Sequence, residues 1–324
     1  MQRQKNIKVQ MLRGIAIVAV ILIHTLPAKG DWQFICRPPI NFAVALFIFL
    51  SGYLTKFDNN DWGLFCRKRI IRVIIPYIIW TVIYTLPLTD PKRLLSFLVS
   101  TKAASQLYYI FVYIQFVLLT PLLGKLAKSR YRWAGWLIAP IAIISYKYTT
   151  IILNITPPSY ISTLWGISCL GWFTYYYLGL LLGNGALHVT SNWKRITTLY
   201  ALSIILQIAE GYVWYHVFDE KNCGTQVKLS CIITSTIFLL MSYFYISDDK
   251  IQLKSKALLT LGEYSFGIYL SHILVIRLFY HFAAWYPKLP FLINSSVIIL
   301  ASLALVYSGR LICGKTVSRW IGLE

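Results

Sequence analysis

Arg13 and His24, in the first apolar stretch of the chain, are the residues whose types and spacing most favour chemistry. They lie eleven residues apart, which at about 100° per residue is three full turns plus roughly 20°, so both project from one face of a helix. If that helix crosses a membrane, His24 sits ~16 Å beyond Arg13 and near the middle of a ~30 Å hydrocarbon core. An ionisable side chain at that depth is typical of a functional site. The structural alternative is a neutral histidine that bonds to a neighbouring helix.

A basic cluster precedes the third apolar stretch, where the sequence reads Arg67-Lys68-Arg69-Ile70-Ile71-Arg72. Arg69 and Arg72 are three residues apart and share a face if the helix has already begun. Two guanidinium groups on one face bind phosphate oxygens well, and Lys68 adds a third cation. The alternative is an ordinary cytoplasmic flank of a membrane helix.

A second histidine, His272, lies about fourteen residues into a late apolar stretch, a depth that brings it to a level similar to that of His24. Ser271 precedes it, and a packing histidine is again the alternative. Glu263 lies nine residues before His272 and therefore points to roughly the opposite face. We expect Glu263 to be an interfacial residue rather than a partner of His272.

The elements that must position these residues are membrane helices. Hydrophobic residues make up 57% of the 324 residues and charged residues only 13%, whereas a soluble domain carries roughly a quarter charged residues. The apolar runs are long and continuous, which favours helices over a barrel. We predict an all-α integral membrane protein with about ten transmembrane helices, in one transmembrane domain over residues 1–324 with no appended soluble domain. The predicted spans are 11–28, 38–55, 73–89, 105–124, 133–148, 163–184, 196–216, 229–246, 258–280 and 292–313.

The basic residues predict the sidedness of these spans. With the N-terminus in the cytoplasm, about two thirds of the 31 Lys and Arg residues fall in cytoplasmic segments. This bias predicts that both termini are cytoplasmic. The net charge of +20 therefore indicates a cytoplasmic membrane face suited to anionic lipid or a phosphate-bearing donor, and no nucleic acid partner is expected.

The six cysteines form no metal-binding spacing, so we predict no metal site. Cys36 and Cys223 both fall in segments predicted to lie outside, and a disulfide between them is an open alternative to two free thiols.

Four segments in order resemble the motifs of the acyltransferase-three family, which includes O-antigen and other surface-polysaccharide O-acetylases. They are Met11 to His24, Phe47 to Leu54, Arg69 to Tyr77 and Leu261 to His272, with a weaker match at Tyr175 to Gly183. Three positions depart from the usual pattern: Ala45 stands where proline is common, Asn41 where some members have arginine (although Arg37 is close), and Gln106 where histidine is common.

The resemblance implies a bacterial inner-membrane O-acyltransferase, with acetyl-CoA or another acyl-CoA as co-substrate and no tightly bound cofactor. The acyl group, usually acetyl, would pass to a hydroxyl of a surface or lipid-linked carbohydrate. The resemblance implies functional roles for Arg13, His24, Arg69 and Arg72.

From these residues we predict that His24 is the general base for the acceptor hydroxyl, or alternatively that it carries the acyl group covalently. Arg13 completes the catalytic pair, and Lys68, Arg69 and Arg72 bind acyl-CoA. The candidates for oxyanion or acceptor contacts are Ser51, Tyr53, Ser271 and His272. A non-enzymatic flippase or exporter of lipid-linked saccharide is the alternative function, because it too has many spans and a basic cytoplasmic face.

Overall fold

The structure, a computed structural model, describes residues 2–28, 30–57, 61–86, 91–190, 192–220, 222–248 and 255–323. No β-strand occurs in these ranges, so the predicted all-α class is confirmed. The α-helices are α1 Gln2–Thr25, α2 Phe42–Tyr53, α3 Trp62–Thr85, α4 Pro91–Ser100, α5 Tyr108–Lys128, α6 Ile138–Ile143, α7 Thr149–Ile152, α8 Ser159–Ile167, α9 Phe173–Gly183, α10 Trp193–Val217, α11 Leu229–Ser247, α12 Lys256–Glu263, α13 Ser265–Phe282 and α14 Phe291–Trp320.

Seven helical stretches of the described chain are long and apolar enough to cross a membrane. Each corresponds to one of the predicted spans. Most of their ends lie within a few residues, about one helical turn, of the predicted ends. They are Asn6–Thr25, Ser105–Lys128, Arg132–Ile152, Trp193–Val217, Leu229–Ser247, Ser265–Phe282 and Phe291–Trp320.

The other three predicted spans coincide with α2, α3 and α9. Helices α2 and α9 have 12 and 11 residues, so they are ~18 Å and ~16 Å long and shorter than a ~30 Å hydrocarbon core. Helix α3 begins at Trp62, earlier than predicted, and the predicted end at 87–89 lies outside the described residues. The count of ten spans and the cytoplasmic placement of both termini remain predictions.

Helices α2 and α9 lie inside the bundle, since most of their residues are buried. Their backbones are also in direct contact. A Cβ at Gly52 would lie 2.3 Å from the Tyr176 carbonyl oxygen, and one at Gly179 would lie 2.2 Å from that of Phe49. Small residues at such contacts let membrane helices approach closely without a side chain between them. The two short helices therefore form one buried unit.

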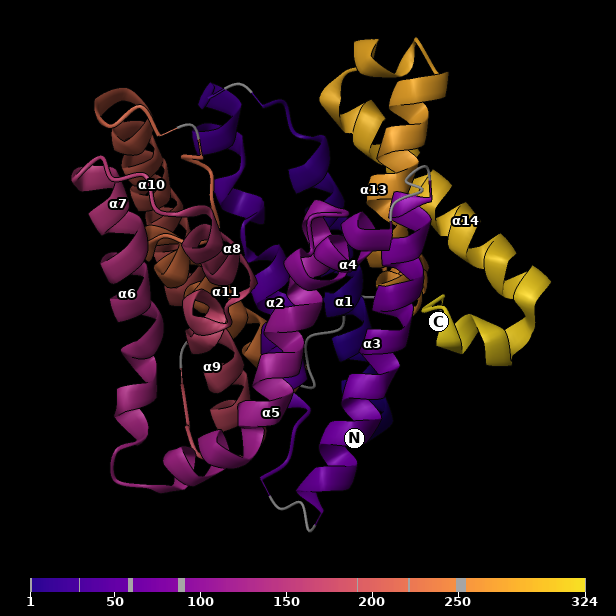
Figure 1. Cartoon of the computed structure of the whole chain (residues 1–324). Helices are drawn as coiled ribbons and strands as arrows, with labels where there is room; N and C mark the ends of the chain where they lie inside the picture. Colours follow the sequence, from indigo (N-terminus) through magenta and orange to yellow (C-terminus); the bar gives the residue numbers. More distant parts are fainter. Residues whose placement is uncertain are drawn as a thin grey trace.

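Helix α1 is the central element and contacts α2, α11, α12, α13 and α14. Figure 1 shows it between α2 and α3, with the N-terminus at the bottom of the view. A Cβ at Gly14 would lie 2.2 Å from the Leu258 carbonyl oxygen, and one at Gly262 would lie 1.9 Å from that of Gln10. Because these two glycines have no side chain, α12 packs directly against the part of α1 that carries Arg13.

The bundle has two ends that matter for function. We call the end at which α1 and α3 begin the basic end, because the cluster Arg67–Arg72 lies toward it. The opposite end contains the segment 26–41 between α1 and α2 and the starts of α5, α9 and α11. Residues of all four meet at one cavity, described below.

Three predicted spans differ from continuous straight helices. The predicted span 163–184 is broken at Ser168, which is extended and separates α8 from α9. The predicted span 258–280 is broken at Tyr264, which leaves the helical conformation and separates α12 from α13. The last span extends to Trp320 with a reversal at Gly314, whose φ of 69° suits glycine. This reversal brings the C-terminal segment back onto α3, where the Trp80 indole donates to the Ile321 carbonyl at 2.9 Å.

Candidate active site

His24 and His272 lie side by side although they come from opposite ends of the chain. Their ring centroids are 5.1 Å apart and the rings are tilted by 53°. His272 is fully buried, whereas His24 keeps partial exposure and so borders accessible space. The structure thus joins two of the candidate residues into one imidazole pair.

The hydrogen bonds of His272 define its tautomer. Its Nδ1 lies 2.8 Å from the Tyr269 carbonyl oxygen and 3.1 Å from that of Ile268. Carbonyls only accept, so Nδ1 carries the proton and Nε2 of the neutral ring is an acceptor. That Nε2 is buried and has no hydrogen-bond partner among the described residues. The ring therefore offers one lone pair beside His24.

His24 lies in the last turn of α1, which ends at Thr25. We predicted a position near the middle of the span, but the helix stops earlier than residue 28. The cause is Pro27, which has no amide hydrogen and disfavours helical geometry in the residue before it. His24 is therefore nearer the end opposite the basic end than its distance from Arg13 alone suggested.

A tyrosine hydroxyl fixes the part of α13 that carries His272. The Tyr84 hydroxyl donates to the Leu270 carbonyl at 2.7 Å and accepts from the Leu274 amide at 3.1 Å. These are the two groups that would otherwise bond to each other in the helix. Gln106 donates to the same hydroxyl at 2.9 Å, and the Tyr269 hydroxyl donates to the Gln106 carbonyl.

Sequence reasoning missed Tyr84 and treated Gln106 only as a departure from a motif. An isolated tyrosine in an apolar helix carries no spacing signal for such a role. The helix on which it acts, α13, is distant in sequence.

Arg13 lies near the middle of α1 and is exposed. Its charge acts on Tyr109 of α5, whose ring lies 5.4 Å from that of Tyr269. The Tyr269 ring is in turn 6.0 Å from that of His272. A run of aromatic rings thus connects the neighbourhood of Arg13 to the imidazole pair.

The predicted phosphate-binding residues lie within α3, because that helix begins at Trp62 with Asp61 as its N-cap. Arg69 and Arg72 are therefore both helical and three residues apart, as the shared face requires. Lys68 and Arg72 are exposed, and Arg69 is half-buried with its guanidinium 4.6 Å from the Phe65 ring centroid. The charge of Arg69 also acts on Tyr176, in the bundle interior.

The remaining candidates are not joined to the pair in the same way. Among the described residues, no hydrogen bond or ring contact links Ser51 or Tyr53 to either histidine. Tyr53 ends α2 and lies 6.3 Å from Tyr243, ring to ring. Ser271 is fully buried and donates to the Ile268 carbonyl at 3.4 Å. Oxyanion roles for these three residues remain predictions.

Glu263 forms an ion pair with Arg310 at 3.1 Å and is largely exposed. It therefore does not approach His272, in agreement with the face on which it was predicted to lie.

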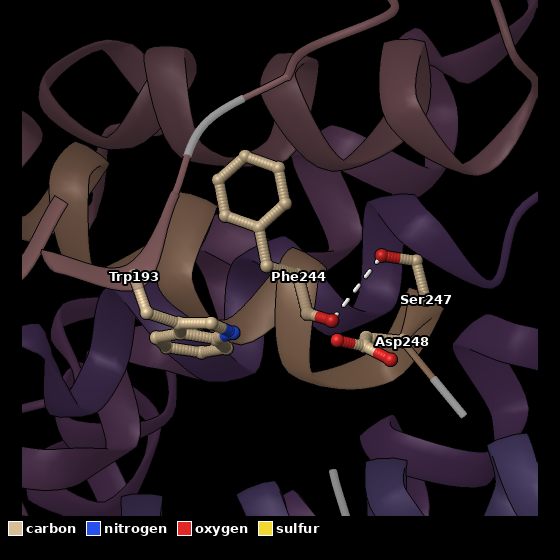
Figure 2. A pocket seen from close by; sticks show the side chains of 4 residues that line it. All are labelled: Trp193, Phe244, Ser247 and Asp248. Atoms are coloured by element: carbon tan, nitrogen blue, oxygen red, sulfur yellow. Dashed lines mark hydrogen bonds between the residues drawn. The ribbon is translucent and has the colours of Figure 1, made fainter. Parts of the chain in front are cut away.

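A small cavity at the basic end does not resemble a site for an anionic nucleotide. It has a volume of about 220 Å³ and is lined by Trp193, Phe244, Ser247 and Asp248. Figure 2 shows the Asp248 carboxylate beside Ser247, whose hydroxyl bonds to the Phe244 carbonyl at 3.3 Å. None of the predicted phosphate-binding cations lines it, and the carboxylate would repel a diphosphate.

Comparison with known proteins gives one match. The sequence profile of the acyltransferase-three family, described as an acyltransferase domain, matches residues 6–310. No curated protein and no solved structure matches the chain.

Proposed function

Since the chain belongs to the acyltransferase-three family, we propose that this membrane acyltransferase moves an acetyl group from cytoplasmic acyl-CoA to a carbohydrate hydroxyl. The acceptor is a surface or lipid-linked glycan in a bacterial inner membrane. The observation that carries the proposal is the imidazole pair of His24 and His272, one of whose nitrogens is buried without a partner. Unpartnered buried polar atoms are rare and often mark sites of function.

The donor binds at the basic end in this proposal. Acyl-CoA is an anion with phosphates at one end and a thioester at the other. Arg69 and Arg72 bind its phosphates, with Lys68 beside them, because planar guanidinium groups match phosphate geometry. The pantetheine arm then extends past Arg13 along the tyrosines toward His24, which places the thioester between the two ends of the bundle.

His24 acts as the general base in the transfer. It takes the proton of the acceptor hydroxyl as the oxygen attacks the thioester carbonyl. The new C–O bond forms, the C–S bond breaks, and CoA leaves as the thiol after the proton returns to sulfur. The alternative is that His24 itself first takes the acyl group.

His272 acts through His24 and is a positioning residue. Its Nε2 accepts a hydrogen bond from the His24 ring when the side chains close the short distance between them. This bond would fix the His24 tautomer and leave the other His24 nitrogen free as the base. The bond to Nε2 would also satisfy the atom that now lacks a partner.

Purified protein in liposomes, with radiolabelled acetyl-CoA and candidate glycans, tests the proposal. Label in a glycan supports the acyltransferase reaction. Saccharide movement across the liposome membrane without any label in glycan or protein would support a transporter and overturn the proposal. Label that stays on the protein in the absence of glycan would favour the covalent route.

A further inference from the structure

The end opposite the basic end holds a second cavity, which Arg37 lines. It has a volume of about 220 Å³, the liquid volume of roughly seven waters. Its lining includes Arg37, Tyr108, Trp165, Trp172, Thr225 and Gln226. Arg37 donates to Gln33, and Gln33 donates to the carbonyl of Pro27, three residues after His24, so the cavity lies near the end of α1 that carries this histidine.

The aromatic side chains form fixed walls of this cavity. The rings of Tyr108 and Trp172 are stacked with centroids 5.9 Å apart, and the Trp165 ring is stacked on Tyr146 at 4.5 Å. Flat apolar walls combined with a few polar groups are typical of small-molecule sites. A single sugar ring, with one apolar face and polar edges, suits this volume and lining.

Arg37 is held rigidly by neutral partners. Its Nε donates to the Asn41 side-chain oxygen at 3.2 Å and its Nη1 to that of Gln33 at 2.9 Å. Those partners are themselves fixed, because Gln33 donates to the Pro27 carbonyl at 2.9 Å and Asn41 to that of Gly224 at 3.3 Å. The guanidinium therefore cannot swing far from the cavity that it lines.

No carboxylate neutralises Arg37 among the described residues. The titratable side chains nearest to it in its electrostatic surroundings are Tyr108, Cys223 and Cys231, none of which is a carboxylate. The nearby Lys228, in contrast, has Glu210 as an opposite charge. The second Nη of Arg37 has no hydrogen-bond partner in the described chain. Arg37 is half-buried, and a half-buried cation with a free donor and no counter-ion favours a ligand that supplies the anion.

We propose that this cavity is the acceptor subsite and that Arg37 selects acceptors bearing an anionic group, a carboxylate or a phosphate on the sugar that is acylated. This proposal rests on the proposed function, which makes the bound sugar the acceptor of the acyl group. Binding of the anion by Arg37 would hold the sugar ring against Tyr108 and Trp172, with a hydroxyl directed toward His24. The donor would then enter from the basic end and the acceptor from the opposite end.

Binding without any acyl donor tests this proposal separately from the reaction. Glucuronic acid, glucose 1-phosphate and glucose are titrated into the purified protein. The readout is the change in tryptophan fluorescence, because Trp165 and Trp172 line the cavity. We expect one or both anionic probes to bind at least about tenfold more tightly than glucose, since a charge-assisted bond contributes that much. The tighter of the two identifies the anion as a carboxylate or a phosphate.

Two variants make the test specific. Arg37→Gln should abolish the preference for the anionic probes, whereas Lys102→Gln, which removes an exposed lysine outside the cavity lining, should leave it unchanged. If Arg37→Gln does not fold, Arg37→Met carries the same expectation because it removes the charge and keeps an unbranched chain. Equal binding of all three probes, no detectable binding, or an unchanged preference in the Arg37 variants would overturn the proposal.

Discussion

The rings of His24 and His272 lie 5.1 Å apart, centroid to centroid, and bring the last turn of α1 against the middle of α13. One ring is fully buried and the other is partly accessible. A histidine pair in which one member is anchored to carbonyl groups and the other borders open space can divide two tasks. In the proposed reaction, the buried ring orients and the accessible ring exchanges a proton with the substrate.

His272→Ala should lower kcat roughly 10–100-fold, the usual cost of losing a side chain that orients a reactive histidine. The KM for acetyl-CoA should stay unchanged, because the proposed phosphate contacts lie at the other end of the bundle. Steady-state kinetics with acetyl-CoA varied at fixed acceptor measures both. His272→Gln, whose amide oxygen can replace Nε2 as acceptor, should recover part of kcat. An unaltered kcat in His272→Ala would show that His272 does not position His24.

Arg69→Ala should raise the KM for acetyl-CoA at least about tenfold, because a charge-assisted bond to phosphate is lost. The matched control is Arg67→Ala, which removes an exposed cation two residues earlier in α3. Initial rates over a range of acetyl-CoA concentrations compare the two. A similar small effect of both variants would mean that only general basic charge is needed and not a specific phosphate contact.

Tyr84→Phe should lower stability by about 1–2 kcal/mol, because the Gln106 side-chain amide loses its bond to the hydroxyl and keeps only the longer bond, 3.2 Å, to the Leu270 carbonyl. The Leu274 amide, without the hydroxyl, would turn to the Leu270 carbonyl, which also accepts from Gln106, and this would shift the turn that carries His272. We therefore expect kcat to fall together with the midpoint of thermal unfolding in detergent. A variant with the lower midpoint and full activity would show that the hydroxyl supports the fold alone.

Thiol labelling checks the sidedness of the bundle. Cys36 is exposed, and it follows α1 at the end opposite the basic end. In intact spheroplasts, a membrane-impermeant maleimide should label a single-cysteine protein that keeps Cys36. A single-cysteine Lys194→Cys protein, with its thiol at the basic end, should react only after permeabilisation. The reverse pattern would place the termini outside.

Thiol labelling of the unchanged protein, with and without prior reduction, tests for a disulfide between Cys36 and Cys223. All six cysteines are free in the structure, and Cys223 is buried. Burial raises the pKa of the Cys223 thiol, so its thiolate fraction at neutral pH is small and labelling should be slow. We expect no disulfide between Cys36 and Cys223, so prior reduction should not increase the number of thiols that react. An increase of two thiols would contradict this prediction.

The sequence allowed the long apolar helices to be predicted because each must satisfy its own backbone and expose apolar side chains to lipid. It also placed His24 and His272 at comparable levels, since rise per residue is constant in a helix. It did not show that the two rings touch, because that depends on how α1 and α13 are rotated against each other. The Gly14 and Gly262 contacts that set α12 on α1 are between segments distant in sequence.

The shortness of α2 and α9 was also not predictable from hydropathy, because buried half-length helices are as apolar as full spans. The early end of α1 could have been inferred from Pro27. Arg37 appeared in the sequence as one more basic residue. Its lack of a counter-ion is visible only once Gln33, Asn41 and Gly224 are brought around it.

Acyl transfer by a His24→Ala protein reconstituted in liposomes tests the central claim most directly. The account predicts a rate at least about a hundredfold below that of the unchanged protein, as expected when a general base is lost. The thermal unfolding midpoint and acetyl-CoA binding should be retained. A folded His24→Ala protein that transfers acetyl at the full rate would contradict the account.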